Sequence, residues 1–150
     1  MRRPVMLFVV VFVFTLTVAG VALAVTKNCT GGECIGTNRS DTINGSEGPD
    51  TVRAGAGNDK ILGNLGDDRL FGDRDNDRVF GGEGNDTVKG STGADTVEGG
   101  PGNDLVRGGT HREANDGVRD ILDCGEGEDT VYFVRGQDVI RDCEHFNTPE

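Results

Sequence analysis

Apolar residues recur along this chain in two different patterns. Near the start, an apolar run extends from Val5 to Val18 and is interrupted only by two threonines. Further on, single apolar residues stand nine positions apart, and the residues on either side of them are mostly polar. Because successive side chains of a strand point to opposite faces, this second pattern predicts short strands with one inward residue each. The inward positions are Ile43, Val52, Ile61, Leu70, Val79, Val88, Val97, Val106, Leu122, Val131 and Ile140.

The first apolar run has the features of an export signal. Arg2 and Arg3 precede it, and Ala22, Leu23 and Ala24 form a small-residue cleavage site after it. We therefore expect residues 1–24 to be a signal peptide, cleaved after Ala24, and the protein to be secreted and extracellular. The alternative is an uncleaved membrane anchor, because residues 5–25 are almost long enough to span a bilayer.

An aspartate stands two residues before each inward position, and a glycine or alanine stands five residues before that aspartate in the regular part of the chain. Eight unbroken units of nine residues run from 36 to 107, and their aspartates are Asp41, Asp50, Asp59, Asp68, Asp77, Asp86, Asp95 and Asp104. Asp120 comes 16 residues after Asp104, so we expect about seven residues between Thr110 and Gly117 to bulge out as a loop. The nine-residue step returns at Asp129 and Asp138, which makes about eleven units in all.

The composition limits what such a chain can be. It has 25 glycines, no tryptophan, and 26 acidic against 15 basic residues, for a formal net charge of −11. Two of the basic residues belong to the leader, so the remainder is more acidic still. The scarcity of apolar residues excludes a conventional enzyme with a large core, and the acidic balance disfavours a nucleic-acid binder. Composition alone is typical of disorder, so the order of the repeats is what indicates a fold.

The tandem units resemble the hemolysin-type calcium-binding repeat, the RTX nonapeptide, as in Gly81–Lys89 with the sequence GGEGNDTVK. The resemblance implies an all-β fold, a right-handed parallel β-roll (β-solenoid) with two nonads to a turn. In each nonad it implies a calcium-binding turn of six residues and a strand of three. The chain then divides into a signal peptide (1–24), an N-terminal cap (25–35), eight regular nonads (36–107), irregular repeats with an inserted loop (108–141), and a C-terminal cap and tail (142–150).

The resemblance also implies Ca²⁺ as the cofactor. With two nonads to a turn, each aspartate stacks above the aspartate two units later, and stacked carboxylates repel one another unless a cation lies between them. Calcium accepts six to eight oxygens in flexible geometry, whereas magnesium demands a strict octahedron. Six sites are expected, between Asp41/Asp59, Asp50/Asp68, Asp59/Asp77, Asp68/Asp86, Asp77/Asp95 and Asp86/Asp104; Asp120 and Asp129 are further candidate ligands. The alternative is that these aspartates only cap turns.

Four cysteines in an exported chain are expected to form disulfides, and four allow three connectivities. Cys29 and Cys34 are five residues apart and could close the N-terminal end. Cys124 and Cys143 are 19 apart, one more than a turn of two nonads, so a β-roll brings them to neighbouring turns. We therefore favour Cys29–Cys34 and Cys124–Cys143. A reduced pair or a metal site is the alternative, although the spacing offers no cluster of four.

These features favour a secreted calcium-binding repeat protein that is not an enzyme and whose fold is ordered by calcium. The alternative is an accessory or adhesive module for a separate extracellular enzyme or surface partner. An ice-binding solenoid would need an unbroken threonine face, and charged residues such as Lys60 and Arg69 interrupt it. We expect no nucleic-acid partner, and no membrane partner once the signal is cleaved.

A few outward positions of the repeats are apolar. The two-nonad turn predicts that Leu62 and Phe80 are neighbours on one sheet and that Phe71 lies on the other. Single apolar residues on a surface are normal and need no function. The sharper hypothesis is that Leu62 and Phe80 form part of a docking patch for a second copy or another protein, because flat apolar patches mark interaction sites.

Overall fold

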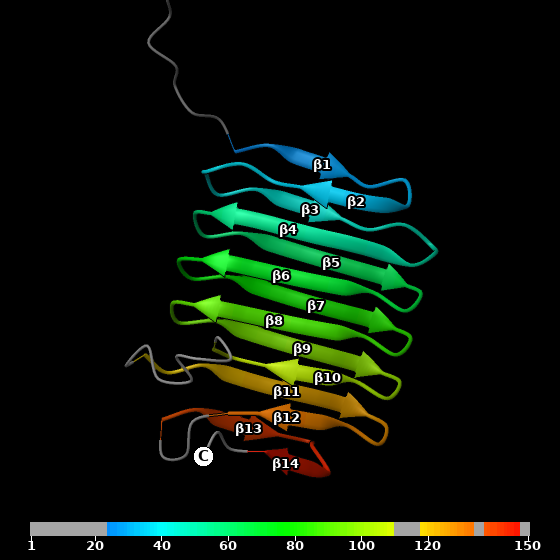
Figure 1. Ribbon diagram of the computed structural model, residues 1–150, viewed down its shortest axis with the longest axis vertical. Helices are drawn as coiled ribbons and strands as arrows, with labels where there is room; N and C mark the ends of the chain where they lie inside the picture. Colours follow the sequence, from blue (N-terminus) through cyan, green and yellow to red (C-terminus); the bar gives the residue numbers. More distant parts are fainter. Residues whose placement is uncertain (1–23, 110–117, 134–136, 148–150) are drawn as a thin grey trace, which may run out of the picture.

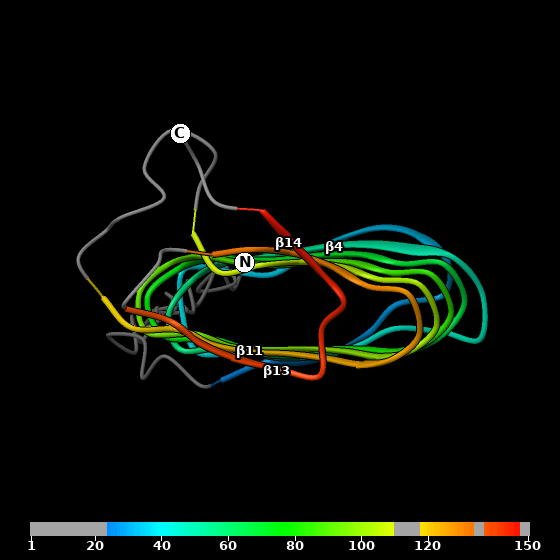
Figure 2. The same ribbon diagram turned by 90° about the horizontal axis from the view of Figure 1, so that it is seen from below.

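The structure is a computed structural model that describes residues 24–109, 118–133 and 137–147. They form a flattened solenoid of two parallel sheets that face each other (Figures 1 and 2). The chain changes sheet after every strand, so two strands make one turn. Residues 1–23 of the predicted leader and the predicted loop at 110–117 lie outside the described residues. In the described part, no helix is long and apolar enough to cross a membrane.

The odd-numbered strands form sheet A and the even-numbered strands form sheet B, each with seven strands. Sheet A contains β1 (Thr26–Asn28), β3 (Thr42–Asn44), β5 (Lys60–Leu65), β7 (Arg78–Glu83), β9 (Thr96–Pro101), β11 (Ile121–Glu126) and β13 (Val139–Arg141). Sheet B contains β2 (Gly32–Ile35), β4 (Asp50–Ala56), β6 (Arg69–Arg74), β8 (Thr87–Thr92), β10 (Leu105–Arg107), β12 (Thr130–Tyr132) and β14 (His145–Asn147). Neighbouring strands are parallel, and residues 18 apart are partners in the regular part, as in the pair Ile61↔Val79. The predicted all-β parallel solenoid is confirmed.

The core is the narrow space between the two sheets. Almost every predicted inward residue is fully buried there: Ile43, Val52, Ile61, Leu70, Val79, Val88, Val97, Val106, Leu122 and Val131. Ile140 near the C-terminal end is only partly buried against them. Cys34 of β2 is the register partner of Val52 and continues the buried row toward the N-terminus. The core is therefore one apolar side chain thick on each sheet.

The strands are longer than the predicted three residues. Strands β5 to β9 and β11 have six residues and β4 has seven. Our expectation was wrong because pairing continues beyond the predicted triplet, as in Asn64↔Gly82 and Leu65↔Glu83. Asn64 and Asp73 take positive φ angles of 82° and 77°, so the chain bends there while it stays paired with the turn beside it.

The inserted loop does not disturb the stacking. Thr96 of β9 is the partner of Ile121 of β11, 25 residues later, and the pairing continues from there in register. The seven extra residues therefore leave the roll as a loop, as the spacing predicted. At both ends the solenoid is longer than the nonads, because β1 and β2 lie in segment 25–35 and β14 lies beyond the last nonad.

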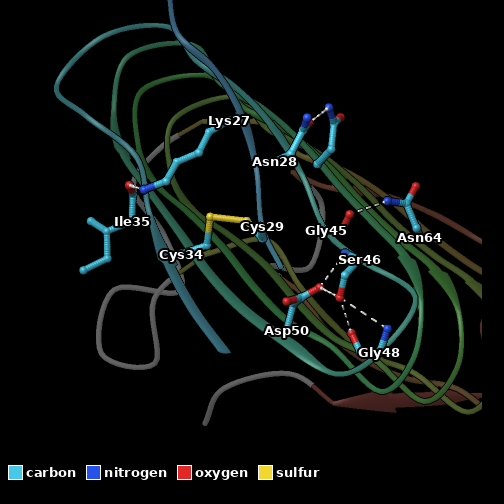
Figure 3. Close-up of a disulfide and its surroundings, with 11 residues drawn as sticks. Lys27, Asn28, Cys29, Cys34, Ile35, Gly45, Ser46, Gly48, Asp50 and Asn64 are labelled. Carbon is cyan, nitrogen blue, oxygen red and sulfur yellow. Dashed lines mark hydrogen bonds between the residues drawn. A yellow bond between two sulfur atoms is a disulfide. The ribbon is translucent and has the colours of Figure 1, made fainter. Parts of the chain in front are cut away.

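Both predicted disulfides are present. Cys29 follows β1 and is bonded to Cys34 of β2, with 5.9 Å between their Cα atoms (Figure 3). Cys124 of β11 is bonded to Cys143 after β13, with 5.1 Å between their Cα atoms. Each bond therefore ties an end of the roll to itself, where a strand has a neighbour on one side only.

The outward apolar residues lie where the register predicted them. Leu62 of β5 and Phe80 of β7 are direct partners on sheet A, while Phe71 of β6 lies on sheet B. Leu62 and Phe80 are half-buried, and the Lys60 ammonium lies 5.9 Å from the centre of the Phe80 ring.

Candidate metal centre

The repeated aspartates precede the strands and are buried at the two rims of the roll. Those that precede strands of sheet A form column A: Asp41, Asp59, Asp77, Asp95, Asp120 and Asp138. Those that precede strands of sheet B form column B: Asp50, Asp68, Asp86, Asp104 and Asp129. All ten predicted ligands are at most 3% exposed. The sequence therefore predicted which acidic residues leave the surface, and burial of so many carboxylates requires an explanation.

Hydrogen bonds link each column from turn to turn. The Oδ1 atom of Asp59 accepts a hydrogen bond from the backbone N–H of Asp41 (2.7 Å), and Asp77 accepts one from Asp59 in the same way (2.9 Å). The same contact joins Asp50 to Asp68 (2.8 Å) in column B, and it continues across the inserted loop. The predicted stacking of each aspartate on the aspartate two units later is therefore confirmed.

Each column ends on a different acceptor at the C-terminal side. Asp138 accepts the N–H of Asp120 at 3.2 Å and so continues column A. In column B a glutamate takes over, because Glu144 accepts the N–H of Asp129 at 3.0 Å. Sequence analysis did not name either residue as a ligand. Asp138 keeps the nine-residue step and could have been included, whereas Glu144 is 15 residues from Asp129 and no periodic signal indicates it.

The second carboxylate oxygen, Oδ2, is the exception in this network. In Asp59, Asp68, Asp77, Asp86, Asp104 and Asp129 this atom is buried and receives no hydrogen bond within the described residues. A buried polar atom without a partner is costly, and a buried charge is more so. These oxygens are therefore positions where a cation would replace the missing donors.

A backbone carbonyl accompanies the second oxygen in several turns. A Cβ atom added to Gly63 would collide with Oδ2 of Asp68 and with the carbonyl oxygen of Gly81, one turn further along. A Cβ atom at Gly81 would collide with Asp86 and Gly99 in the same way. Only glycine at this place allows a carboxylate and a carbonyl of the next turn to approach so closely.

The donor set suits calcium better than a transition metal. Within the described ranges, no three His, Cys, Asp or Glu side chains gather at one point. A zinc site would need such a cluster, whereas calcium is bound by carboxylates together with backbone carbonyls. The residues present therefore fit calcium, and the aspartates with an unpartnered Oδ2 atom are the ones that would hold it.

Burial raises the pKa of the inner aspartates. The pKa of Asp77 is raised to about 8, first because burial disfavours the charged form and then because Asp95 and Asp59 carry like charges nearby. Burial likewise raises the pKa of Asp104 to about 7 and those of Asp59 and Asp68 to about 6. The backbone N–H bonds lower these pKa values but do not offset the burial. Without a cation, the columns thus hold protons far above the ordinary carboxyl range.

The first two turns are different, because they supply their own donors. The Oδ2 atom of Asp41 accepts hydrogen bonds from the Thr37 N–H (2.7 Å) and hydroxyl (2.8 Å). Ser46 donates to Asp50 Oδ2 in the same way, at 2.6 and 2.9 Å (Figure 3). At the equivalent place further along, Ser91 has a positive φ of 96° and donates its N–H to the Gly108 carbonyl instead. The sequence pattern did not distinguish these two turns, although a hydroxyl residue after the first glycine is visible there.

The raised pKa values predict that the metal-free protein is stabilised by acid. The folded chain binds protons between the ordinary value of 3.8 and about 8 that the unfolded chain does not bind, so stability falls as the pH rises through this window. In the presence of a chelator, thermal unfolding followed by circular dichroism should give a higher midpoint at about pH 5 than at about pH 8. Asp77→Asn should weaken this dependence, while the exposed Asp75→Asn should change it little. A midpoint that rises with pH would contradict the assignment.

Comparison with known families agrees with the geometry. The family model described as RTX calcium-binding nonapeptide repeat (4 copies) matches residues 35–70, 60–88 and 80–110, just over half of the chain. No curated protein matches the chain at a significant level. These repeats bind calcium, and proteins built from them are typically structural or binding proteins rather than catalysts. The chain belongs to the family of RTX calcium-binding nonapeptide repeat proteins.

Proposed function

We propose that this protein is a secreted calcium-binding module without catalytic activity, in which calcium orders the fold. The observation that carries the proposal is the set of buried Oδ2 atoms without donors in both aspartate columns, in a chain of net charge −11. The core adds only one apolar side chain per strand, so it offers little to compensate for buried carboxylates. A cation at each rim would remove the repulsion and supply the missing contacts.

Export is supported by the leader and by the disulfides. Two disulfides suit an oxidising compartment outside the cytosol. Cleavage after Ala24 would also have a structural use, because the Val25 nitrogen already donates to Asp41 Oδ1 at 3.1 Å. As a new N-terminus this nitrogen would be an ammonium group, and a charge-assisted bond to a carboxylate is stronger than a neutral one. Processing at this site would therefore place a positive charge at the open end of column A.

Calcium should drive folding of the mature chain. In chelator at neutral pH we expect circular dichroism of a largely disordered chain, because the columns carry uncompensated charge. Millimolar calcium should produce the β spectrum, and magnesium at the same concentration should produce much less of it. Identical spectra from chelator to excess calcium would contradict the proposed role.

The aspartates should contribute unequally to calcium binding. Asp77→Asn removes a carboxylate whose Oδ2 atom has no donor, so we expect calcium affinity to fall by about tenfold or more in calorimetry. Asp41→Asn should change the affinity little, because Thr37 and Val25 already satisfy that carboxylate. The two variants form a matched pair in column A. Equal losses would mean that calcium is not shared between stacked inner turns.

A second candidate function is self-association through Leu62 and Phe80, favoured by their adjacency on the outer face of sheet A. The calcium-loaded protein should then sediment as a larger species at high concentration. The double variant Leu62→Thr with Phe80→Thr should be monomeric and retain calcium binding. A wild-type protein that is already monomeric at high concentration excludes pairing of copies and leaves an accessory role toward a foreign partner.

A further inference from the structure

The outer face of sheet B carries a row of cations and aromatic rings. The outward residues that end successive triplets are direct register partners, from β4 to β12. In order they are Arg53, Phe71, Lys89, Arg107 and Tyr132. Neighbouring strands lie about 4.8 Å apart, so this is a continuous row along the axis of the stack. Arg69 adds a further cation on β6, in the parallel outward row described below. In a chain of net charge −11, this concentration of positive side chains on one face is exceptional.

The aromatic rings hold the arginines in place. The Arg53 guanidinium lies 4.8 Å from the centre of the Phe71 ring, and it also contacts Asp73 at 3.4 Å. The Arg107 guanidinium lies 4.4 Å from the centre of the Tyr132 ring. A guanidinium stacked on a ring loses side-chain freedom before any ligand arrives, and its N–H groups remain able to pair with a carboxylate or sulfate. The row is thus partly preorganised for anions.

Lys89 lies in the middle of the row, between Phe71 and Arg107. Its pKa is lowered by burial and by the nearby positive charges of Arg107 and Arg53, while Asp73 acts in the opposite direction. Lys89 also lines a hollow of about 440 Å³, together with Arg74, Asp73 and Thr92. Positive charge therefore exceeds negative charge around this hollow, and an anion bound there would relieve the repulsion.

A second outward row runs parallel to the cations and is rich in hydroxyl groups. Its members begin the same triplets and are Thr51, Arg69, Thr87, Leu105 and Thr130. Threonine hydroxyls both donate and accept hydrogen bonds. A ligand that follows the stack would thus meet charges in one row and neutral hydroxyl groups in the next.

We propose that the outer face of sheet B binds an acidic polysaccharide, which lies along the stack axis. Its carboxylate or sulfate groups pair with Arg53 and Lys89, and Arg107 extends the same row. Its hydroxyl groups exchange hydrogen bonds with the threonine row. Calcium-dependent folding presents the face, and the ligand touches none of the buried aspartates.

Other polyanions fit this face less well. Single-stranded nucleic acids are bound by stacking of bases on open aromatic rings, and arginines cover Phe71 and Tyr132 here. A net charge of −11 also repels a duplex. An acidic peptide usually adds as a strand to an open sheet edge, whereas the backbone bonds of β4 to β12 are already used on both sides.

The test compares two variants of the full calcium-loaded chain that each lose two positive charges. The first is Arg53→Gln with Lys89→Gln on sheet B, and the matched control is Lys60→Gln with Arg78→Gln on the outer face of sheet A. Chondroitin sulfate is the probe and neutral dextran the blank. Circular dichroism and calcium titration check that both variants still fold, which separates loss of this face from failure of calcium-dependent folding.

We expect wild type and the sheet A variant to bind chondroitin sulfate alike, and the sheet B variant to bind at least tenfold more weakly. Equal binding by the two variants would overturn the proposal, since it would indicate general attraction or calcium bridging from the acidic turns. Absence of binding to folded wild type, or stronger binding to polyglutamate or single-stranded DNA, would overturn it as well.

Discussion

A buried carboxylate needs hydrogen-bond donors or a positive charge, and this roll repeats that demand at almost every strand. The column geometry meets half of it, because the N–H of one aspartate satisfies Oδ1 of the aspartate on the next turn. The other oxygen remains without a donor in most turns. The stacking of turns, the need for glycine beside each carboxylate and the dependence on a cation all follow from this single arrangement.

The nine-residue period couples this demand to the core. The aspartate, the residue two places later and the first glycine of the next unit point to the same side of the chain, because side chains alternate along a strand. One face of each unit therefore contributes a carboxylate, an apolar side chain such as Leu70, and a glycine that makes room for the next carboxylate. A register shift of one residue would turn the aspartates outward and the charged neighbours inward, so the pattern fixes the stacking strongly.

Periodicity explains why so much of the structure could be predicted. The buried residues, the two aspartate columns, the seven-residue insertion and the pairing of Cys124 with Cys143 all depend only on counting along the chain. The strand lengths could not be obtained that way, since they depend on residues such as Asn64 adopting a left-handed conformation while still paired. Glu144 replaces an aspartate at an irregular spacing, and the donation from Thr37 and Ser46 depends on local turn geometry. Sequence shows the period, whereas the exceptions need coordinates.

The division between inward and outward positions also bears on how such a protein acquires a binding partner. Stability resides in the rims and the inner row, so outward residues can change with little cost to the fold. Residues 18 apart in sequence become neighbours on one flat face, and a few substitutions then build a row that no local segment reveals. Sheet B has accumulated Arg53, Lys89 and Arg107 in this way, although the chain as a whole is acidic. A cationic face on an acidic solenoid thus requires no change in the metal sites, and the two properties can evolve independently.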